Sequence, residues 1–294
     1  MTELCELEAL EDRLRLHVEA LASIPRPPGS AAHTLAQASI EAHFREAGFE
    51  IARQPFRANG TPGVNVLTVP KPDRPDLPLV IVGAHYDSIP DSPGADDNAS
   101  AVAALMELAD AMGPLLDDPG PWHARLQLAA YDQEEYGMVG SAAHARSLKE
   151  PIRGMISLEM LGYADATPGS QHLPPHLKGL YPDVADFIGI VGNNSSKALL
   201  AEAVAGFKLV PNLNVQSLAV PGRGEELPEA RLSDHSNFWD RGLPALMVTD
   251  TSFFRNPHYH RPGDLPETLD YAFLARVAAG VQTAVYRLLR AESI

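Results

Sequence analysis

Cysteine, clustered positive charge and long apolar runs are all scarce in this sequence. Cys5 is the single cysteine of the 294 residues, which excludes an internal disulfide bond and a metal site built from cysteines. Lys and Arg number 23 against 38 Asp and Glu, a formal net charge of −15, and they form no basic run. We therefore expect neither nucleic acid nor an anionic membrane surface as a partner, because phosphate binding depends on clustered Lys and Arg.

Targeting and membrane segments are also not evident. We find no stretch that approaches the roughly 20 apolar residues needed to span a bilayer. The first residues, MTELCELEALEDRLRL, are rich in acidic side chains and lack the apolar segment of a secretory signal peptide. We therefore expect no membrane association and a cytoplasmic location, with secretion left open if a leader has been removed.

The succession of predicted elements indicates an α/β fold. Apolar patterning and turn residues predict helices at 4–21, 30–47, 99–113, from 138, 196–207 and 271–289, and strands at 49–56, 64–69, 79–82, 125–131, 154–160, 187–191, 214–218 and 244–249. This alternation predicts a three-layer α/β/α structure around a mixed, largely parallel central sheet. No shift in composition marks a boundary, so we expect a single domain over residues 1–294, with loop insertions at about 162–186 and 221–231.

Residues 79–100 join a predicted buried strand to a predicted helix. His85 and Asp87 follow the strand, and Asp96 and Asp97 precede the helix after a loop of Pro, Ser and Gly. Polar side chains at such a junction are typical of functional sites in open α/β sheets. Taken alone, a His-x-Asp pair is more often an ordinary polar pair than a metal site, and adjacent aspartates more often cap a helix.

Carboxylates and imidazoles also follow the other predicted strands, namely Glu134, Glu135, Glu159, Asp234, His235, His258 and His260. Because such strands end at one edge of the sheet, we expect these side chains to meet there. Unpaired carboxylates packed together repel one another and have raised pKa values, and a divalent cation relieves that repulsion. Imidazole and carboxylate ligands without thiolates suit zinc, and also manganese or cobalt.

Five separated motifs carry a family resemblance, in the order His85-x-Asp87, Gly94-Ala95-Asp96-Asp97-Asn98-Ala99-Ser100, Asp132-x-Glu134-Glu135-x-Gly137, Ser157-Leu158-Glu159-Met160 and Tyr259-His260. With these motifs the chain resembles the M28 family of zinc metallopeptidases, in particular its bacterial leucyl aminopeptidases, from about residue 64 to residue 271. The resemblance implies a zinc-exopeptidase-like fold and an aminopeptidase that acts on a peptide or aminoacyl substrate with a free N-terminus. It also implies two zinc ions, for which cobalt or manganese can substitute.

The resemblance assigns metal-binding roles to individual residues. Asp97 is expected to bridge the two ions. The other expected ligands are His85 and Glu159 for one ion, and Glu135 and His260 for the other. Part of the family has Asp at the position of Glu159, and either residue can ligate a metal.

The remaining roles concern catalysis. Asp87 resembles the residue that holds the His85 ring through its second nitrogen and so fixes the tautomer. Glu134 matches the general base, which takes a proton from the metal-bridging water as that water attacks the N-terminal peptide bond. In this family the peptide bond after the bridging aspartate is often cis, so we expect a cis bond between Asp97 and Asn98.

Three further residues are expected to contact the substrate, namely Asp234, His235 and Tyr259. A structural role is an equal alternative for each of them. The substrate's side-chain preference is not indicated by the sequence. Three basic residues would favour acidic substrates if they faced the cleft, although surface solvation is the more ordinary role for them; they are Arg223 and Arg231 of the second loop, and Arg255.

Other functions are compatible with the same fold. A glutaminyl cyclase-like acyltransferase would keep a single zinc ion, held by Asp97, Glu135 and His260, whereas the presence of His85 and Glu159 favours two ions and hydrolysis. A carboxypeptidase or dipeptidase would use the same ligands with a different anchored end of the substrate. A non-enzymatic binding domain would lack some ligands or the base, so it is the least favoured alternative. The sequence does not indicate an oligomeric state.

Overall fold

The computed structural model of the chain describes residues 2–58, 60–175 and 177–293, with side chains described from residue 6 onward, so the Cys5 side chain lies outside the described part. The helices are α1 (Thr2–Leu21), α2 (Ala31–Glu46), α3 (Ala101–Asp117), α4 (Val139–Ser147), α5 (Lys197–Phe207), α6 (His235–Trp239) and α7 (Tyr271–Arg290). The strands are β1 (Ile51–Ala58), β2 (Thr61–Thr68), β3 (Leu79–His85), β4 (Arg125–Tyr131), β5 (Ile152–Glu159), β6 (Phe187–Asn193), β7 (Asn214–Val220) and β8 (Ala245–Thr249).

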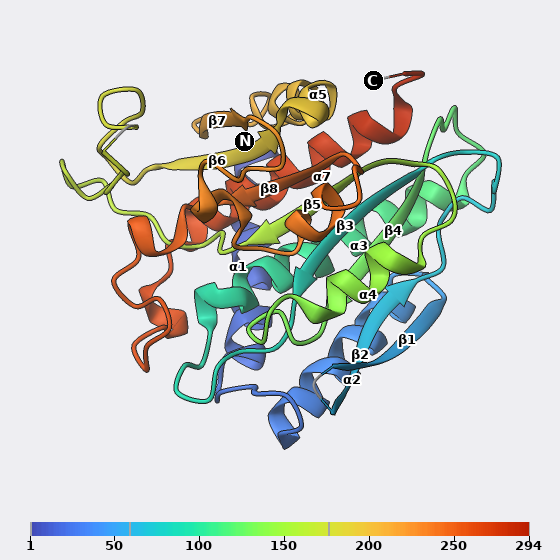
Figure 1. Cartoon of the computed structure of the whole chain (residues 1–294), viewed down its shortest axis with the longest axis horizontal. Coiled ribbons are helices and arrows are strands. Elements are labelled where there is room, and N and C mark those ends of the chain that lie inside the picture. Colours follow the sequence, from blue (N-terminus) through green and yellow to red (C-terminus); the bar gives the residue numbers. More distant parts are fainter. Residues whose placement is uncertain (1, 59, 176, 294) are drawn as a thin grey trace.

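The described strands form one eight-stranded sheet in the order β1-β2-β4-β3-β5-β8-β6-β7 (Figure 1). Its centre, β4, β3, β5 and β8, is parallel. On one side β1 and β2 form an antiparallel hairpin, and β2 runs antiparallel to β4. On the other side β6 pairs with β7 in parallel and with β8 in antiparallel orientation. The predicted mixed, largely parallel sheet is confirmed.

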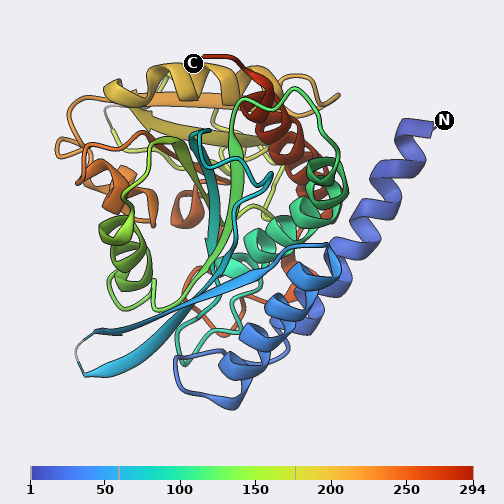
Figure 2. The same cartoon turned by 90° about the vertical axis from the view of Figure 1, so that its right-hand side faces the viewer.

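Helices cover both faces of the sheet, as Figure 2 shows with the sheet seen nearly edge-on. One face is covered by α1, α2, α3, α5 and α7, which share the larger hydrophobic core. The opposite face carries α4 and α6, which pack over a smaller core. The predicted three-layer α/β/α architecture is therefore confirmed.

Strand β3 is central because both of its faces are apolar. Its alternate residues point to opposite faces, with Val80, Val82 and Ala84 in the larger core and Leu79 and Ile81 in the smaller. The parallel register pairs Gly83 of β3 with Ser157 of β5. Two residues further along, His85 and Glu159 therefore lie level with each other at the carboxyl edge of the sheet.

Helix α3 extends further than the sequence predicts. The prediction ends it at Gly113-Pro114, but it continues to Asp117. Although Pro114 cannot donate a backbone hydrogen bond, Leu116 is buried and anchors the last turn in the core. Gly113 is explained by packing instead of helix termination, because a Cβ there would collide with the carbonyl oxygen of Ala47 at the end of α2.

The segment that contains α3 is also more apolar than expected. By length and composition Ala95–Asp117 would be sufficient to cross a membrane, and 78% of its most apolar window is buried inside the fold. The expectation that no stretch approaches this length and apolarity is therefore wrong. Packing of α3 between the sheet and its neighbouring helices accounts for the apolar composition.

Arg26 joins the segment between α1 and α2 to the loop that follows β3. Its side chain is 1% exposed, and its guanidinium donates to four carbonyl oxygens, those of Leu21, Tyr86, Pro93 and Gly94. Burial lowers the pKa of Arg26 to about 10, so it stays charged at neutral pH. The carbonyl groups at both ends of the loop are thereby held by one cation.

We expect Arg26→Met to lower the free energy of unfolding by about 3 kcal/mol, because four carbonyl groups lose a charged donor. Urea denaturation monitored by circular dichroism measures the change. Arg74→Met is the matched control, since Arg74 lies at the surface and pairs with Asp76 at 2.7 Å; its effect should stay below about 1 kcal/mol. Equal effects of the two substitutions would contradict the role of Arg26.

His144 on α4 gives a pH-dependent prediction. Its ring is buried, its Nδ1 lies 3.0 Å from the Tyr131 hydroxyl, and burial lowers its pKa to about 4. The unfolded chain, with a pKa near 6.5 for this group, therefore binds the proton more readily, and stability is lost as the pH falls from about 7 toward 4. We expect His144→Gln to reduce the stability difference between pH 7 and pH 5 by about 2 kcal/mol, measured by urea denaturation at both pH values. An unchanged difference would show that His144 has the same pKa in the folded and the unfolded chain, which would contradict the effect of burial.

Candidate metal centre

His85, the last residue of β3, is buried with one ring nitrogen bonded and the other free. Its Nδ1 lies 3.2 Å from the carbonyl oxygen of Asp87, which places the N–H on Nδ1 and the lone pair on Nε2. Among the described residues Nε2 has no hydrogen-bond partner, yet it lies 3.2 Å from Oδ1 of Asp97 and 3.6 Å from Oε1 of Glu159. The Nε2 lone pair of a neutral ring would be repelled by the two carboxylates, and either a proton or a metal ion between them removes that repulsion, so this arrangement fits a metal ligand.

Two groups of side chains are spaced to hold a metal ion. The first is His85, Asp97 and Glu159, and the second is Asp97, Glu135 and His260; within each group the donor atoms lie within 4.8 Å of one another. Asp97 belongs to both groups, and its two oxygens face different imidazoles. Oδ1 lies 3.2 Å from His85 Nε2, and Oδ2 lies 3.2 Å from His260 Nε2. The structure thus brings together all five residues predicted as ligands.

The loop that carries Asp97 is fixed by its neighbours. The Asp264 carboxylate accepts hydrogen bonds from the backbone N–H groups of Asp96 and Asp97, at 2.8 and 3.1 Å. The Asn98 amide donates to the Leu158 carbonyl and accepts from the Met160 N–H, so it is hydrogen-bonded to the backbone on both sides of Glu159. The predicted cis peptide bond between Asp97 and Asn98 is present.

Asp264 and Asn98 are site-building residues that the sequence analysis missed. Asn98 was signalled by its place inside a motif, whereas nothing in the sequence pointed to Asp264. Gly94, just before the loop, has a φ of +65°, and a Cβ there would collide with the Asp97 carbonyl oxygen. The glycine of the motif is therefore explained by the backbone geometry of the site.

Asp87 acts mainly on the backbone of the next loop. Its carboxylate accepts from the N–H groups of Glu134 and Glu135, at 3.0 and 3.3 Å. Its contact with the His85 ring runs chiefly through the backbone carbonyl, since the carboxylate Oδ1 is 3.5 Å from Nδ1. The Asp87 carboxylate thus fixes the backbone of the two neighbouring glutamates, and its role in holding the His85 ring stays a prediction.

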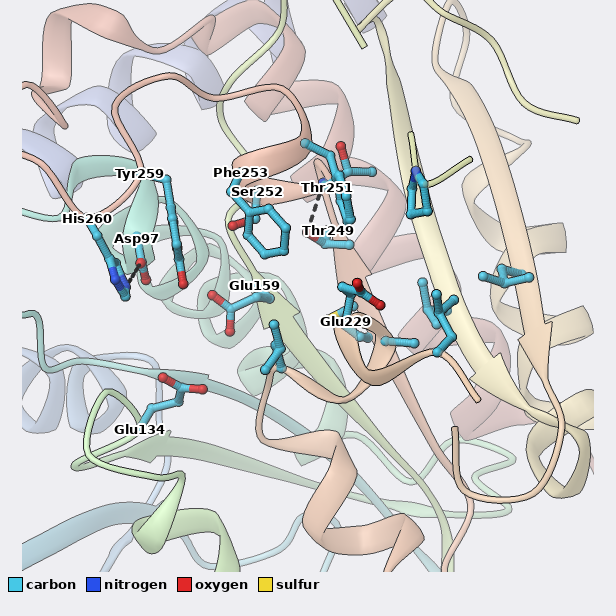
Figure 3. A pocket seen from close by; sticks show the side chains of 18 of the residues that line it. Asp97, Glu134, Glu159, Glu229, Thr249, Thr251, Ser252, Phe253, Tyr259 and His260 are labelled. Carbon is cyan, nitrogen blue, oxygen red and sulfur yellow. Dashed lines mark hydrogen bonds and ion pairs between the residues drawn. The ribbon is translucent and has the colours of Figure 1, made fainter. Parts of the chain in front are cut away.

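Glu134 and Glu135 diverge although they are adjacent in the chain. Glu135 Oε2 lies 2.9 Å from His260 Nε2, within the second ligand group. Glu134 belongs to neither group, and its Oε2 lies 3.9 Å from His85 Nε2. Both residues line a cavity that opens beside the ligands, in which Figure 3 shows the Glu134 side chain. Glu134 is therefore a carboxylate next to the metal-binding groups and free to act on a bound molecule.

The electrostatics of the cluster also favour a cation. Burial and the nearby Asp97 carboxylate raise the pKa of Glu135 to about 7. Burial likewise raises the pKa of Glu134, with the Glu159 carboxylate adding to the effect. Burial alone would lower the pKa of His85, but Glu159 and Glu134 outweigh it and raise the value. This excess of negative charge is what divalent cations compensate, and the nitrogen and oxygen donors fit such ions.

Of the three residues predicted to contact substrate, one lines the cavity and two do not. Tyr259 lines the cavity, and its ring stacks on His260 with 3.9 Å between the ring centroids. Asp234 and His235 are fully buried and are not among the lining residues. His235 Nε2 lies 2.9 Å from the Ala230 carbonyl, to which it donates, and its ring packs edge-on against Trp239 of the unpredicted helix α6. For His235 the structural alternative fits better than substrate contact, because α6 turns its ring into the core. The two carboxylate oxygens of Asp234 are buried and have no hydrogen-bond partner among the described residues, so its role stays a prediction.

The cavity has a volume of about 330 Å³ and extends from the ligand groups to both long loops (Figure 3). Leu173 and Leu177 come from the first loop and Leu227 and Glu229 from the second, so both loops contribute to the cavity wall. The basic residues of these regions do not line it. Arg223 and Arg231 pair with Glu225 and Asp240, and Arg255 is buried and donates to Gln171 and to the Phe187 carbonyl.

Comparison with known proteins gives a family and a fold. The profile of Peptidase family M28 matches residues 65–285. Uncharacterized protein YfbL of Escherichia coli is 40% identical over 261 residues, which are 84% of this chain and 78% of YfbL. Further curated relatives are 25–34% identical, and this chain spans about half their length.

Among solved structures, BSAP, a zinc aminopeptidase from Bacillus subtilis, superposes with a TM-score of 0.74 at 16% identity, covering 94% of each chain. Glutaminyl cyclase from Porphyromonas gingivalis superposes with a TM-score of 0.69 at 19% identity, covering 94% of this chain and 97% of that one. Both likenesses show that the fold is shared.

Proposed function

This chain belongs to peptidase family M28, and from that premise we propose that it is an aminopeptidase that binds two zinc ions. The observation that carries the proposal is the position of Asp97, whose two oxygens face the imidazoles of two separate ligand groups. A zinc-dependent hydrolase agrees with the family and with a donor set that has no thiolate. Cobalt or manganese would suit the same ligands.

The ligands divide between the ions in this proposal. His85 and Glu159 would hold one ion, Glu135 and His260 the other, and Asp97 both. When bound, the ions would supply Lewis acidity toward the scissile carbonyl and lower the pKa of water toward neutrality.

Glu134 then serves as general base. It takes a proton from the attacking water and returns that proton to the amine that leaves when the peptide bond breaks. Its place beside the ligand groups supports this role, as do the hydrogen bonds from its own N–H and that of Glu135 to Asp87. The Tyr259 hydroxyl, on the cavity wall, would donate to the developing oxyanion.

Glutaminyl cyclization is the second candidate, because a glutaminyl cyclase shares the fold. The first ligand group is complete, which argues against cyclization, because His85 and Glu159 would have no metal to bind in a single-zinc enzyme. A carboxypeptidase or dipeptidase differs in the end of the substrate that is anchored. Assays with different substrates distinguish all of these functions.

The test uses metal-stripped protein restored with Zn²⁺, Co²⁺ or Mn²⁺. Aminoacyl p-nitroanilides, their Nα-acetylated forms, an N-terminal Gln peptide and an N-blocked peptide with a free C-terminus form the substrate panel. We expect metal-dependent hydrolysis of the free-amine substrates alone, with two ions bound per chain. Cyclization of the Gln peptide without aminopeptidase activity, or cleavage from the free C-terminus, would overturn the proposal.

A further inference from the structure

We propose that the cavity selects substrates whose N-terminal residue has a long cationic side chain, lysine or arginine, and that Glu229 recognises the charge. The inference rests on the proposed aminopeptidase function, because it assigns the side-chain preference of that same site. Its evidence is different, since it comes from the part of the cavity away from the candidate metal ligands.

Outside the candidate metal centre, the only charge that described residues place on the cavity wall is negative. Apart from Glu134 and the proposed ligands, Glu229 is the charged residue among the described residues that line the cavity, and no described Lys or Arg lines it. Glu229 lies in the short turn Pro228–Arg231 of the second loop, and Figure 3 shows its side chain at the cavity wall. An acidic substrate side chain would be repelled there.

The Glu229 carboxylate is not neutralised by its neighbours. The two cations closest in the loop sequence are engaged elsewhere, Arg223 with Glu225 at 2.9 Å and Arg231 with Asp240 at 2.9 Å. Within the described part of the chain no ion pair to Glu229 forms. An exposed carboxylate that already lines a cavity is therefore available to a cation carried by a ligand.

Outside the candidate ligand groups, the side chains that line the cavity are mostly apolar. Leu173 and Leu177 of the first loop, Val191 of β6, Leu218 of β7, and Leu227 and Leu232 of the second loop line the same cavity. Lysine and arginine side chains have apolar stems and charged ends, so the stem would contact these walls while the end pairs with Glu229. A leucine or phenylalanine side chain would cover the carboxylate and leave it without a partner, which is unfavourable. A single carboxylate among apolar walls therefore favours a cationic side chain.

The test compares kcat/KM for the p-nitroanilides of lysine, arginine, norleucine and glutamate. Norleucine matches the lysine stem and lacks its ammonium group, so the pair isolates the charge. We expect lysine to exceed norleucine by about tenfold or more, and glutamate to be the poorest substrate. Glu229→Gln should remove the lysine advantage, by raising KM for the lysine substrate and bringing the ratio of lysine to norleucine to about one. Glu226→Gln, an exposed glutamate of the same loop that does not line the cavity, is the matched control and should behave as the wild type.

Binding measurements separate this inference from the proposed function. Lysinamide and norleucinamide are titrated into the zinc-loaded protein by calorimetry, with and without Glu229→Gln. If no aminoacyl substrate is hydrolysed but lysinamide still binds more tightly in a Glu229-dependent way, the proposed activity fails and the selectivity holds. If norleucine substrates and ligands equal or exceed lysine, or if Glu229→Gln changes both equally, the selectivity is overturned while aminopeptidase activity stands.

Discussion

Replacing Glu134 by glutamine is expected to lower kcat for aminoacyl hydrolysis by about 10³-fold or more, without loss of bound metal. Glutamine has the same shape but cannot accept the proton of the attacking water at neutral pH. Because Glu134 belongs to neither group of candidate ligands, the metal content should stay at the wild-type value. Steady-state kinetics and elemental analysis of the same preparation measure both quantities.

Glu135→Gln is the contrasting variant for this prediction. Glu135 lies 2.9 Å from His260 Nε2 in the second ligand group, so its substitution should reduce the metal content instead of sparing it. Both variants keep the backbone N–H groups that donate to Asp87, so the loop should retain its position. A Glu134→Gln enzyme that hydrolyses substrate at near the wild-type rate would contradict the assignment of the general base.

Asp97→Asn is expected to abolish binding of both metal ions, whereas Glu159→Gln should remove only the ion on the His85 side. The difference follows from the geometry, because Oδ1 of Asp97 faces His85 and Oδ2 faces His260. An asparagine replaces one of these oxygens by an NH₂ group, which has no lone pair to offer a metal, and leaves the other as a neutral amide oxygen, which is a weaker ligand than a carboxylate. Equilibrium dialysis against Zn²⁺ followed by elemental analysis gives the number of ions per chain.

A thermal readout supports the metal count independently of activity. Ions that bind only the folded chain raise its melting temperature, by an amount that grows with the logarithm of the ratio of ion concentration to Kd. The rise should be lost in Asp97→Asn and partly kept in Glu159→Gln. Asp91→Asn, at an exposed position of the same loop, should match the wild type in both measurements. Wild-type protein with one ion per chain would instead favour the single-zinc alternative.

The candidate metal groups were largely predictable because each motif is local. His85 and Glu159 end neighbouring parallel strands, and parallel strands with matched register bring their carboxyl ends to one edge. The identity of the side chains then limits the chemistry that they can perform together. Asp97 and Glu135 follow the same logic from the adjoining loops. The strands themselves were predicted because apolar runs and alternation depend on near neighbours in the chain.

The supporting contacts were not predictable, because they join distant parts of the chain. Arg26 reaches carbonyl groups up to 68 residues away, and Asp264 holds N–H groups 167 and 168 residues away. The burial of His235 by α6 is a similar case, since a short helix without a long apolar pattern gives no signal. The extension of α3 past Pro114 depends on the burial of Leu116, which outweighs the local preference of proline.

Residues 79–100 show which features of the site follow from the sequence and which depend on the tertiary structure. The sequence by itself determined that a buried strand would bring His85 to the edge of a sheet and that Asp97 would follow in the loop before the next helix, because both features depend on consecutive residues. Only the tertiary structure decided that the two oxygens of Asp97 face different imidazoles and that Glu229 lines the same cavity as the candidate ligands and several leucines. Those facts depend on the relative positions of loops far apart in the chain, which packing and long-range hydrogen bonds set together.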